Sequence, residues 1–153
     1  MTKRTAKAAA DVLPGGGTTA NARRGEQTVM LEGVEYVMRP SFAAIEAIET
    51  KTGKALAELM ILATAAKLKG VEIAVIVTEC VKADLRQRGR GAEADMWQER
   101  RVAELLMDAE GGLFKMITDL VGFLKAAATG EYTSKGELKA AAGSPTGDIP
   151  AAA

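Results

Sequence analysis

The stretch TVMLEGVEYVMRPSFAAIEAIETKTG, residues 28–53, predicts a β-hairpin that runs directly into a capped helix. The apolar strand positions are Val29, Leu31, Val34, Tyr36 and Met38. Glu32 and Gly33 lie between the strands, and glycine accepts the positive φ that a tight hairpin turn needs. Pro40 ends the second strand because proline has no N–H to donate to a ladder. A two-stranded ribbon is marginal in water, so we expect the hairpin to lie on an apolar surface.

The residues after Pro40 carry the signals of a helix start and stop. Ser41 is a candidate N-cap, because its hydroxyl can accept a hydrogen bond from a backbone N–H two or three residues later. Phe42, Ile45 and Ile48 recur at helical spacing. Gly53 is placed to end the helix in a left-handed turn.

Four further helical segments are expected, at residues 54–69, 71–88, 92–110 and 113–128. Gly70 is expected to end the first of them, and Gly111 with Gly112 separates the last two. The expected fold class is mainly α, a small α+β protein. An N-terminal two-stranded β-hairpin precedes a bundle of four to five helices, with disordered termini.

The segment at residues 71–88 is ambiguous from sequence alone. Its first half is rich in β-branched residues, which favour a strand by propensity. Its length and the lack of internal turn signals favour a helix that is buried for its first three turns, and we prefer the helix. Cys80 lies on this segment and is expected to be a small core residue, since no activating group is evident beside it.

The chain divides into one domain and two flanking segments. Residues 1–25 read as a disordered basic leader, residues 26–130 as a hairpin plus helical domain, and residues 131–153 as a disordered tail. The leader is interpreted as solvated, with a basic arm for an acidic partner as the alternative. The RQRGRG run at residues 86–91 is interpreted as a connecting loop, with an anion or RNA patch as the alternative.

Composition excludes most catalytic chemistry. The chain of 153 residues contains no histidine and one cysteine, which excludes His-based triads, a Cys-rich zinc site and an intrachain disulfide. No phosphate-binding or dinucleotide-binding glycine motif occurs. Acidic pairs such as Glu46 with Glu49 and Glu104 with Asp108 share helix faces, which is typical of solvated surfaces. We therefore expect no enzyme activity, no cofactor and no metal.

Charge and hydropathy restrict the partners and the location. The formal net charge is zero, whereas a protein that binds nucleic acid is usually basic. No run approaches the roughly 18 apolar residues of a membrane span. The N-terminus lacks the apolar run of a secretory signal. A cytoplasmic protein without a nucleic-acid or membrane partner is expected.

The helical segments carry more apolar surface than a one-sided surface helix needs. Residues 113–128 are apolar nearly all round, which indicates either complete burial or a contact surface for another chain. The candidate partner-binding residues there are Leu113, Phe114, Ile117, Leu120, Phe123 and Leu124. Trp97 is either a rim residue or a contact anchor. Four methionines either fill the core or form an adaptable surface: Met60, Met96, Met107 and Met116.

The order of these features resembles a known family. LEGVEYVMRPSF at residues 31–42 is followed by AAIEAIE at residues 43–49, TG at residues 52–53 and a Leu/Ala-rich helix. This looks like the gene-transfer-agent family of phage tail proteins, which resemble the tail assembly chaperones of long-tailed phages. The likeness covers about residues 26–130. Its most specific part is the junction Arg39-Pro40-Ser41-Phe42.

The resemblance implies a non-catalytic assembly factor in the cytoplasm of the host cell. Such chaperones are thought to coat the long, helical tape measure protein and to give way as tail tube subunits polymerise around it. The family supplies no catalytic residues to carry over. The tape measure protein is therefore the expected partner, with the tail tube protein as a second candidate. Self-association of the chain stays open as well.

Two other functions stay open. One is a structural tail component of the virion, either a tail tube or a connector subunit, although tube subunits are typically richer in strands. The other is a small helical nucleic-acid binder that uses the leader together with Arg86, Arg88 and Arg90.

Overall fold

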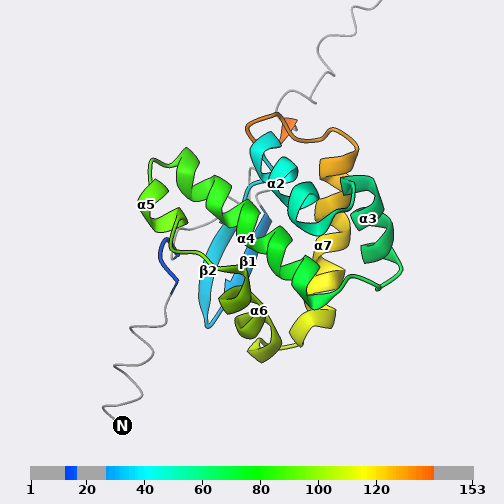
Figure 1. Ribbon diagram of the computed structural model, residues 1–153, viewed down its shortest axis with the longest axis horizontal. Helices are drawn as coiled ribbons and strands as arrows, with labels where there is room; N and C mark the ends of the chain where they lie inside the picture. Colours follow the sequence, from blue (N-terminus) through cyan, green and yellow to red (C-terminus); the bar gives the residue numbers. More distant parts are fainter. Residues whose placement is uncertain (1–12, 17–26, 140–153) are drawn as a thin grey trace, which may run out of the picture.

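The computed structural model describes residues 13–16 and 27–139. In this part of the chain, an antiparallel two-stranded hairpin precedes six helices (Figure 1). The elements are β1 (Gln27–Leu31), β2 (Val34–Met38), α2 (Phe42–Thr52), α3 (Leu56–Thr64), α4 (Gly70–Gln87), α5 (Gly91–Ala94), α6 (Glu99–Asp108) and α7 (Gly112–Ala128). The expected mainly-α fold with an N-terminal hairpin is confirmed. The disorder expected for residues 1–12, 17–25 and 140–153 concerns residues outside the described part.

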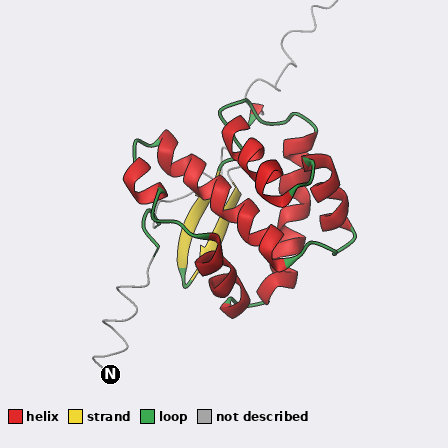
Figure 2. Cartoon of the chain, in the orientation of Figure 1, coloured by secondary structure: helices red, strands yellow, loops and turns green. Residues whose placement is uncertain are grey.

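The hairpin has the predicted turn. Leu31 pairs with Val34 across a two-residue loop. Glu32 and Gly33 both have positive φ, 51° and 77°, as in a type I′ turn. One face of the ribbon is buried in the core, as a marginal two-stranded sheet requires. Figure 2 shows the two strands lying against the helical layer rather than standing free.

The predicted limits of α2 are also confirmed. Ser41 caps the helix, because its Oγ accepts a hydrogen bond of 3.1 Å from the backbone N–H of Ala44. Gly53 adopts the left-handed conformation with φ 69°, and its N–H donates to the carbonyl of Glu49.

Helix α4 resolves the ambiguity at residues 71–88 in favour of a helix. It crosses the middle of the molecule, and β2, α2 and α6 pack around it (Figure 1). Ile73, Ile76, Val77 and Cys80 are fully buried. Burial on all sides favours apolar side chains of any shape, so the β-branched residues here serve packing rather than a strand. Cys80 is the predicted core residue.

The predicted end of the second helix is wrong. The expected segment was 54–69, but α3 ends at Thr64, and Gly70 is the first residue of α4 instead of a stop signal. A non-glycine residue takes the left-handed position: Ala66 has φ 55° and donates to the carbonyl of Ala63. The N–H of the next residue bonds to the carbonyl of Leu62, which completes a Schellman motif.

The single helix expected at residues 92–110 is two helices. The chain leaves α5 after Ala94 and begins α6 at Glu99. The break carries Trp97 into the core, where its ring lies edge-on to Tyr36 with a centroid separation of 4.9 Å. The Trp97 indole N–H donates to the Pro14 carbonyl over 3.0 Å. Trp97 is therefore neither a rim residue nor a contact anchor.

Both expected domain boundaries need correction. Leu13 is buried, and its carbonyl accepts a 2.8 Å hydrogen bond from the Tyr36 hydroxyl, so residues 13–16 of the predicted leader pack on the domain. At the other end, residues 131–139 form a turn with a bridge between Tyr132 and Leu138. The Ser134 carbonyl accepts from the Phe42 N–H over 2.8 Å. The packed domain thus extends beyond residue 130.

We expect Ser41→Ala to lower the free energy of unfolding by about 1 kcal/mol, because the Ala44 N–H then loses its side-chain acceptor. Urea denaturation measures this change. Ser134→Ala is the matched control, since that side chain is exposed. Equal stability losses in the two variants would show that Ser41 does not cap α2.

Candidate partner-binding surfaces

The buried carboxylates of α4 are occupied by ion pairs to other parts of the fold. Glu72 accepts from the Nζ of Lys54 and, over 2.9 Å, from the backbone N–H of Lys69. Burial raises the pKa of Glu72, but the hydrogen bonds from Lys54 and Lys69 outweigh it, and the pKa is lowered overall. This carboxylate therefore stays charged and anchors the start of α4.

The same pattern repeats along the helix. Lys51 of α2 lies 2.7 Å from Glu79 and also bonds Glu99, and these two carboxylates raise the Lys51 pKa. Further along the helix, Asp84 forms ion pairs with two arginines. Its Oδ2 lies 2.9 Å from the Nε of Arg88, and its Oδ1 lies 3.3 Å from the Nη2 of Arg39. Burial nevertheless raises the Asp84 pKa, with the two arginines opposing the shift. These pairs tie α4 to its neighbours, so these carboxylates are structural.

Cys80 is a buried free thiol. Burial raises the pKa of the Cys80 thiol far above its ordinary value, with Glu79 adding to the shift. A thiol so held is neither nucleophilic nor accessible. Within residues 13–16 and 27–139, no group of three or more His, Cys, Asp or Glu side chains could hold a metal ion.

Most of the predicted contact residues on α7 lie in the core of the monomer. Ile117, Leu120, Phe123 and Leu124 are buried, and Leu113 is half-buried. α3 packs along α7 and covers much of this apolar surface. These side chains are therefore unavailable to a partner in this conformation. Phe114 alone of the six is largely exposed, at 71% of its surface.

The methionines divide between the two roles. Met116 is buried and Met60 is half-buried, so both contribute to the packed interior. Met96 and Met107 are exposed, at 63% and 67% of their surfaces. Only these two retain the character of an adaptable contact surface.

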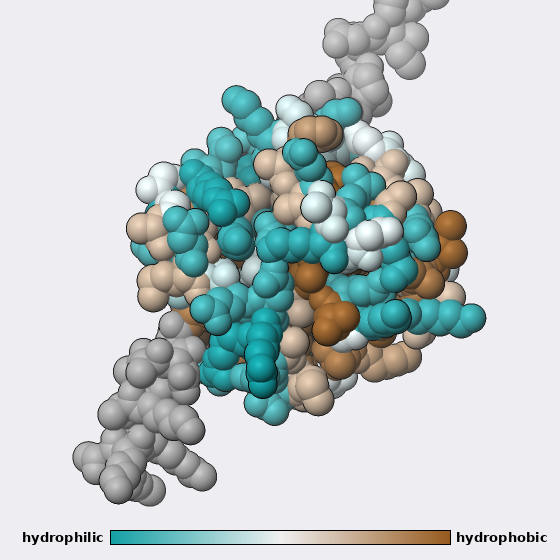
Figure 3. Space-filling view, viewed as in Figure 1, coloured by the Kyte–Doolittle hydropathy of each residue, from teal (hydrophilic) through white to brown (hydrophobic). Residues whose placement is uncertain are grey.

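Three exposed apolar side chains lie where helix ends meet. Val71 is the second residue of α4, Met107 lies near the end of α6 and Phe114 lies near the start of α7. A Cβ added to Gly70 would lie 3.2 Å from the Leu113 side chain, so the first turns of α4 and α7 touch. We call Val71, Met107 and Phe114 the helix-end patch. Figure 3 shows apolar surface on the face over the starts of α4 and α7.

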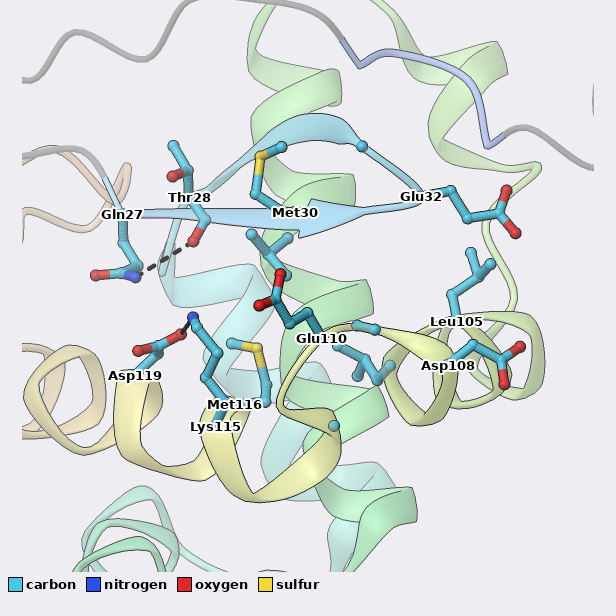
Figure 4. Close-up of a pocket in the computed structure, with 15 residues that line it drawn as sticks. Gln27, Thr28, Met30, Glu32, Leu105, Asp108, Glu110, Lys115, Met116 and Asp119 are labelled. Atoms are coloured by element: carbon cyan, nitrogen blue, oxygen red, sulfur yellow. Dashed lines mark hydrogen bonds and ion pairs between the residues drawn. The ribbon is translucent and has the colours of Figure 1, made fainter.

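A second surface lies along β1. A groove of about 690 Å³ is bounded on one side by β1 and its turn, and on the other by residues at the end of α6 and the start of α7. We call it the β1 groove. In Figure 4, Thr28 and Met30 lie on the strand above it, while Glu110 rises toward the strand from the α6–α7 connection. Met116 forms part of its apolar wall.

The rim of the β1 groove is acidic. Its carboxylates come from Glu32, Asp108, Glu110 and Asp119, against one lysine, Lys115. That lysine is occupied by Asp119, 2.7 Å away. The sequence did not point to this site, because β1 and Glu32 are distant in the chain from Asp108, Glu110 and Asp119, and only the fold brings them together.

The arginines of the 86–91 run are paired with carboxylates. Arg90 lies 2.7 Å from Glu93, and Arg86 lies 3.5 Å from Asp95. Arg88 holds the buried Asp84, as described above. Nearby negative charge weakens the attraction of these arginines for phosphate, so the geometry does not favour a nucleic-acid interface here.

Comparison with protein-family models, curated protein sequences and solved structures found no match to this chain. In the described part of the chain, none of the helices has the length and apolar character needed to cross a bilayer. The surfaces above are therefore interpreted from their own geometry.

We expect Glu72→Gln to destabilise the protein by about 1–2 kcal/mol at pH 7 and by progressively less as the pH falls below 4.5. The folded pKa of Glu72 is lowered, so its contribution is present above the unfolded value and is lost as the pH falls through the folded value. Urea denaturation from pH 3 to pH 7 measures the difference.

Glu46→Gln on the exposed side of α2 is the control for this substitution, and it should change the free energy of unfolding by less than about 0.5 kcal/mol. A Glu72→Gln effect that is the same at both ends of the pH range would contradict the assigned ion pair.

Proposed function

We propose that this protein is a non-catalytic tail assembly chaperone of a phage or gene transfer agent, which binds the tape measure protein and helps tail tube assembly. The proposal starts from the resemblance of residues 26–130 to that family. It is carried by one observation, the exposed helix-end patch of Val71, Met107 and Phe114. Its site of action would be the host cytoplasm during particle assembly.

The patch suits a client that is a long helix with apolar stripes. Large apolar side chains left in water gain about 1.5–3 kcal/mol each when a partner buries them. Side chains presented from three helix ends can fit between the ridges of a client helix, as in helix-in-groove recognition. Methionine and phenylalanine together tolerate a variable apolar sequence, which a chaperone that coats a long client needs.

The family junction is consistent with this proposal. Arg39 and Pro40 end the strand, Ser41 caps the helix, and Phe42 stays 66% exposed. The Arg39 guanidinium holds the buried Asp84 and lies 3.7 Å from Glu137. These residues have structural roles in this chain, so a likeness to the family at this junction would follow from a shared local fold as readily as from a shared binding surface.

Co-expression with the tape measure protein tests the proposal. We expect the client to remain soluble and to co-purify with the wild-type chain. Replacing Val71 and Phe114 together with serine should weaken that complex by about tenfold or more, because both side chains lose their apolar burial on binding. Co-purification yield and a binding isotherm measure the effect.

Ile61→Ser is the matched control, since Ile61 is similarly exposed, at 62% of its surface, but lies on α3, outside the helix-end patch. A wild-type chain that neither solubilises nor binds the client would contradict the proposal. Stoichiometric presence of this protein in purified particles would favour the structural tail component instead.

A further inference from the structure

The outer edge of β1 carries backbone groups that point away from β2. In this register Gln27, Val29 and Leu31 exchange hydrogen bonds with β2, because the pair next to a two-residue turn is a bonded one. The N–H and C=O groups of the alternating residues, Thr28 and Met30, therefore point to the other side.

These outward groups are almost unused within residues 13–16 and 27–139. One hydrogen bond is recorded for them, from the Gln27 side-chain amide to the Thr28 carbonyl over 3.3 Å. Beside β2, the Arg39 N–H that follows the strand donates to the Cys80 carbonyl of α4, and α4 packs against this strand. The edge of β1 is the one that borders the β1 groove, so it is the edge at which we consider another strand.

The β1 groove lies along this open edge. Its described lining comes from β1, the hairpin turn and the α6–α7 region, with no contribution from β2. A chain lying about 4.8 Å from β1, the usual strand separation, would thus enter the groove. Met30 and Met116 offer it apolar contacts, and Asp108 and Glu110 offer it negative charge.

We propose that an extended basic segment of a partner protein binds in the β1 groove as an added strand. Its backbone pairs with Thr28 and Met30, and its Lys or Arg side chains lie beside Asp108 and Glu110. No ion pair within the described residues occupies Asp108 or Glu110, so both carboxylates can receive a partner cation. That the assembly client supplies this segment rests on the proposed function, whereas the strand addition does not.

A second copy of this chain is a poor occupant of the edge. Pairing β1 with β1 would bring two acidic rims together, and like charges across an interface oppose association. The rim selects instead for the opposite charge. A basic segment satisfies the open backbone groups and the unpaired carboxylates at the same time.

The test uses the full chain and a synthetic probe, acetyl-KVRVKVR-amide, followed by NMR. We expect the Thr28 and Met30 amides to become at least about tenfold better protected from hydrogen exchange when the probe binds. A probe with glutamate at every basic position should bind about tenfold more weakly or not at all. A probe N-methylated at alternate residues should lose protection at both amides.

Variants of the protein separate the backbone from the charges. Met30→Pro removes an outward N–H while leaving the ladder to β2 intact, so it should abolish probe binding, whereas Met30→Ala should retain most of it. Joint replacement of Asp108 and Glu110 with lysine should weaken probe binding by about tenfold or more. Glu46→Lys, on the exposed side of α2, is the matched charge control and should leave binding unchanged.

Three results would overturn the inference. They are the absence of probe binding at millimolar concentration, binding without protection of Thr28 and Met30, and protection that appears without probe as the protein concentration rises. The last would identify a second copy as the occupant. If the tape measure protein fails to bind but the probe binds as expected, the proposed function fails while the strand addition stands. If that client binds equally to wild type and to the groove variants, the proposed function stands and the client is excluded as the source of the added strand.

Discussion

The side chains of α4 are buried around most of the helix circumference. The position of each neighbouring element follows from the α4 side chains that it covers. Apolar residues such as Ile76 and Val77 need covering from several directions, which the hairpin, α2 and α6 supply. The carboxylates inside this enclosure need cations, because an unpaired buried charge costs several kcal/mol. Lys51, Lys54 and Arg39 provide them from three different segments. Apolar burial and charge pairing thus position the same neighbours.

The parts of the fold that sequence predicts correctly are those whose signals are local. The hairpin turn needs only a residue that tolerates positive φ, and the cap of α2 needs only a hydroxyl at Ser41. The predicted helix boundaries are wrong where a residue other than glycine ends the helix. Ala66 ends α3 in the conformation usually reserved for glycine, while Gly70, which looks like a stop, begins the next helix. Propensity cannot detect such an exchange, because tertiary packing outweighs it.

The candidate surface was harder to predict than the fold. An apolar helix is equally consistent with a core position and with a contact surface, and only the packing of α3 against α7 shows that Leu120 and Leu124 belong to the core. Trp97 was misplaced for a related reason, since its burial depends on a break after α5 and on the distant Pro14 carbonyl. The groove beside β1 is lined by residues from three elements, β1, α6 and α7, and no local pattern relates the strand to the two helices.

The open edge of β1 and its acidic rim have a common physical explanation. An unpaired strand edge invites pairing with identical edges, and proteins commonly suppress that hazard with charge. Here Glu110 reaches toward the strand from the α6–α7 connection, and Asp108 adds negative charge to the lining of the same groove. The backbone of β1 therefore stays able to pair, while pairing with another acidic edge is disfavoured. The same acidic side chains that oppose pairing between two copies of the chain also make the β1 edge selective for its partner. A basic segment is attracted to these carboxylates, whereas an acidic one is repelled.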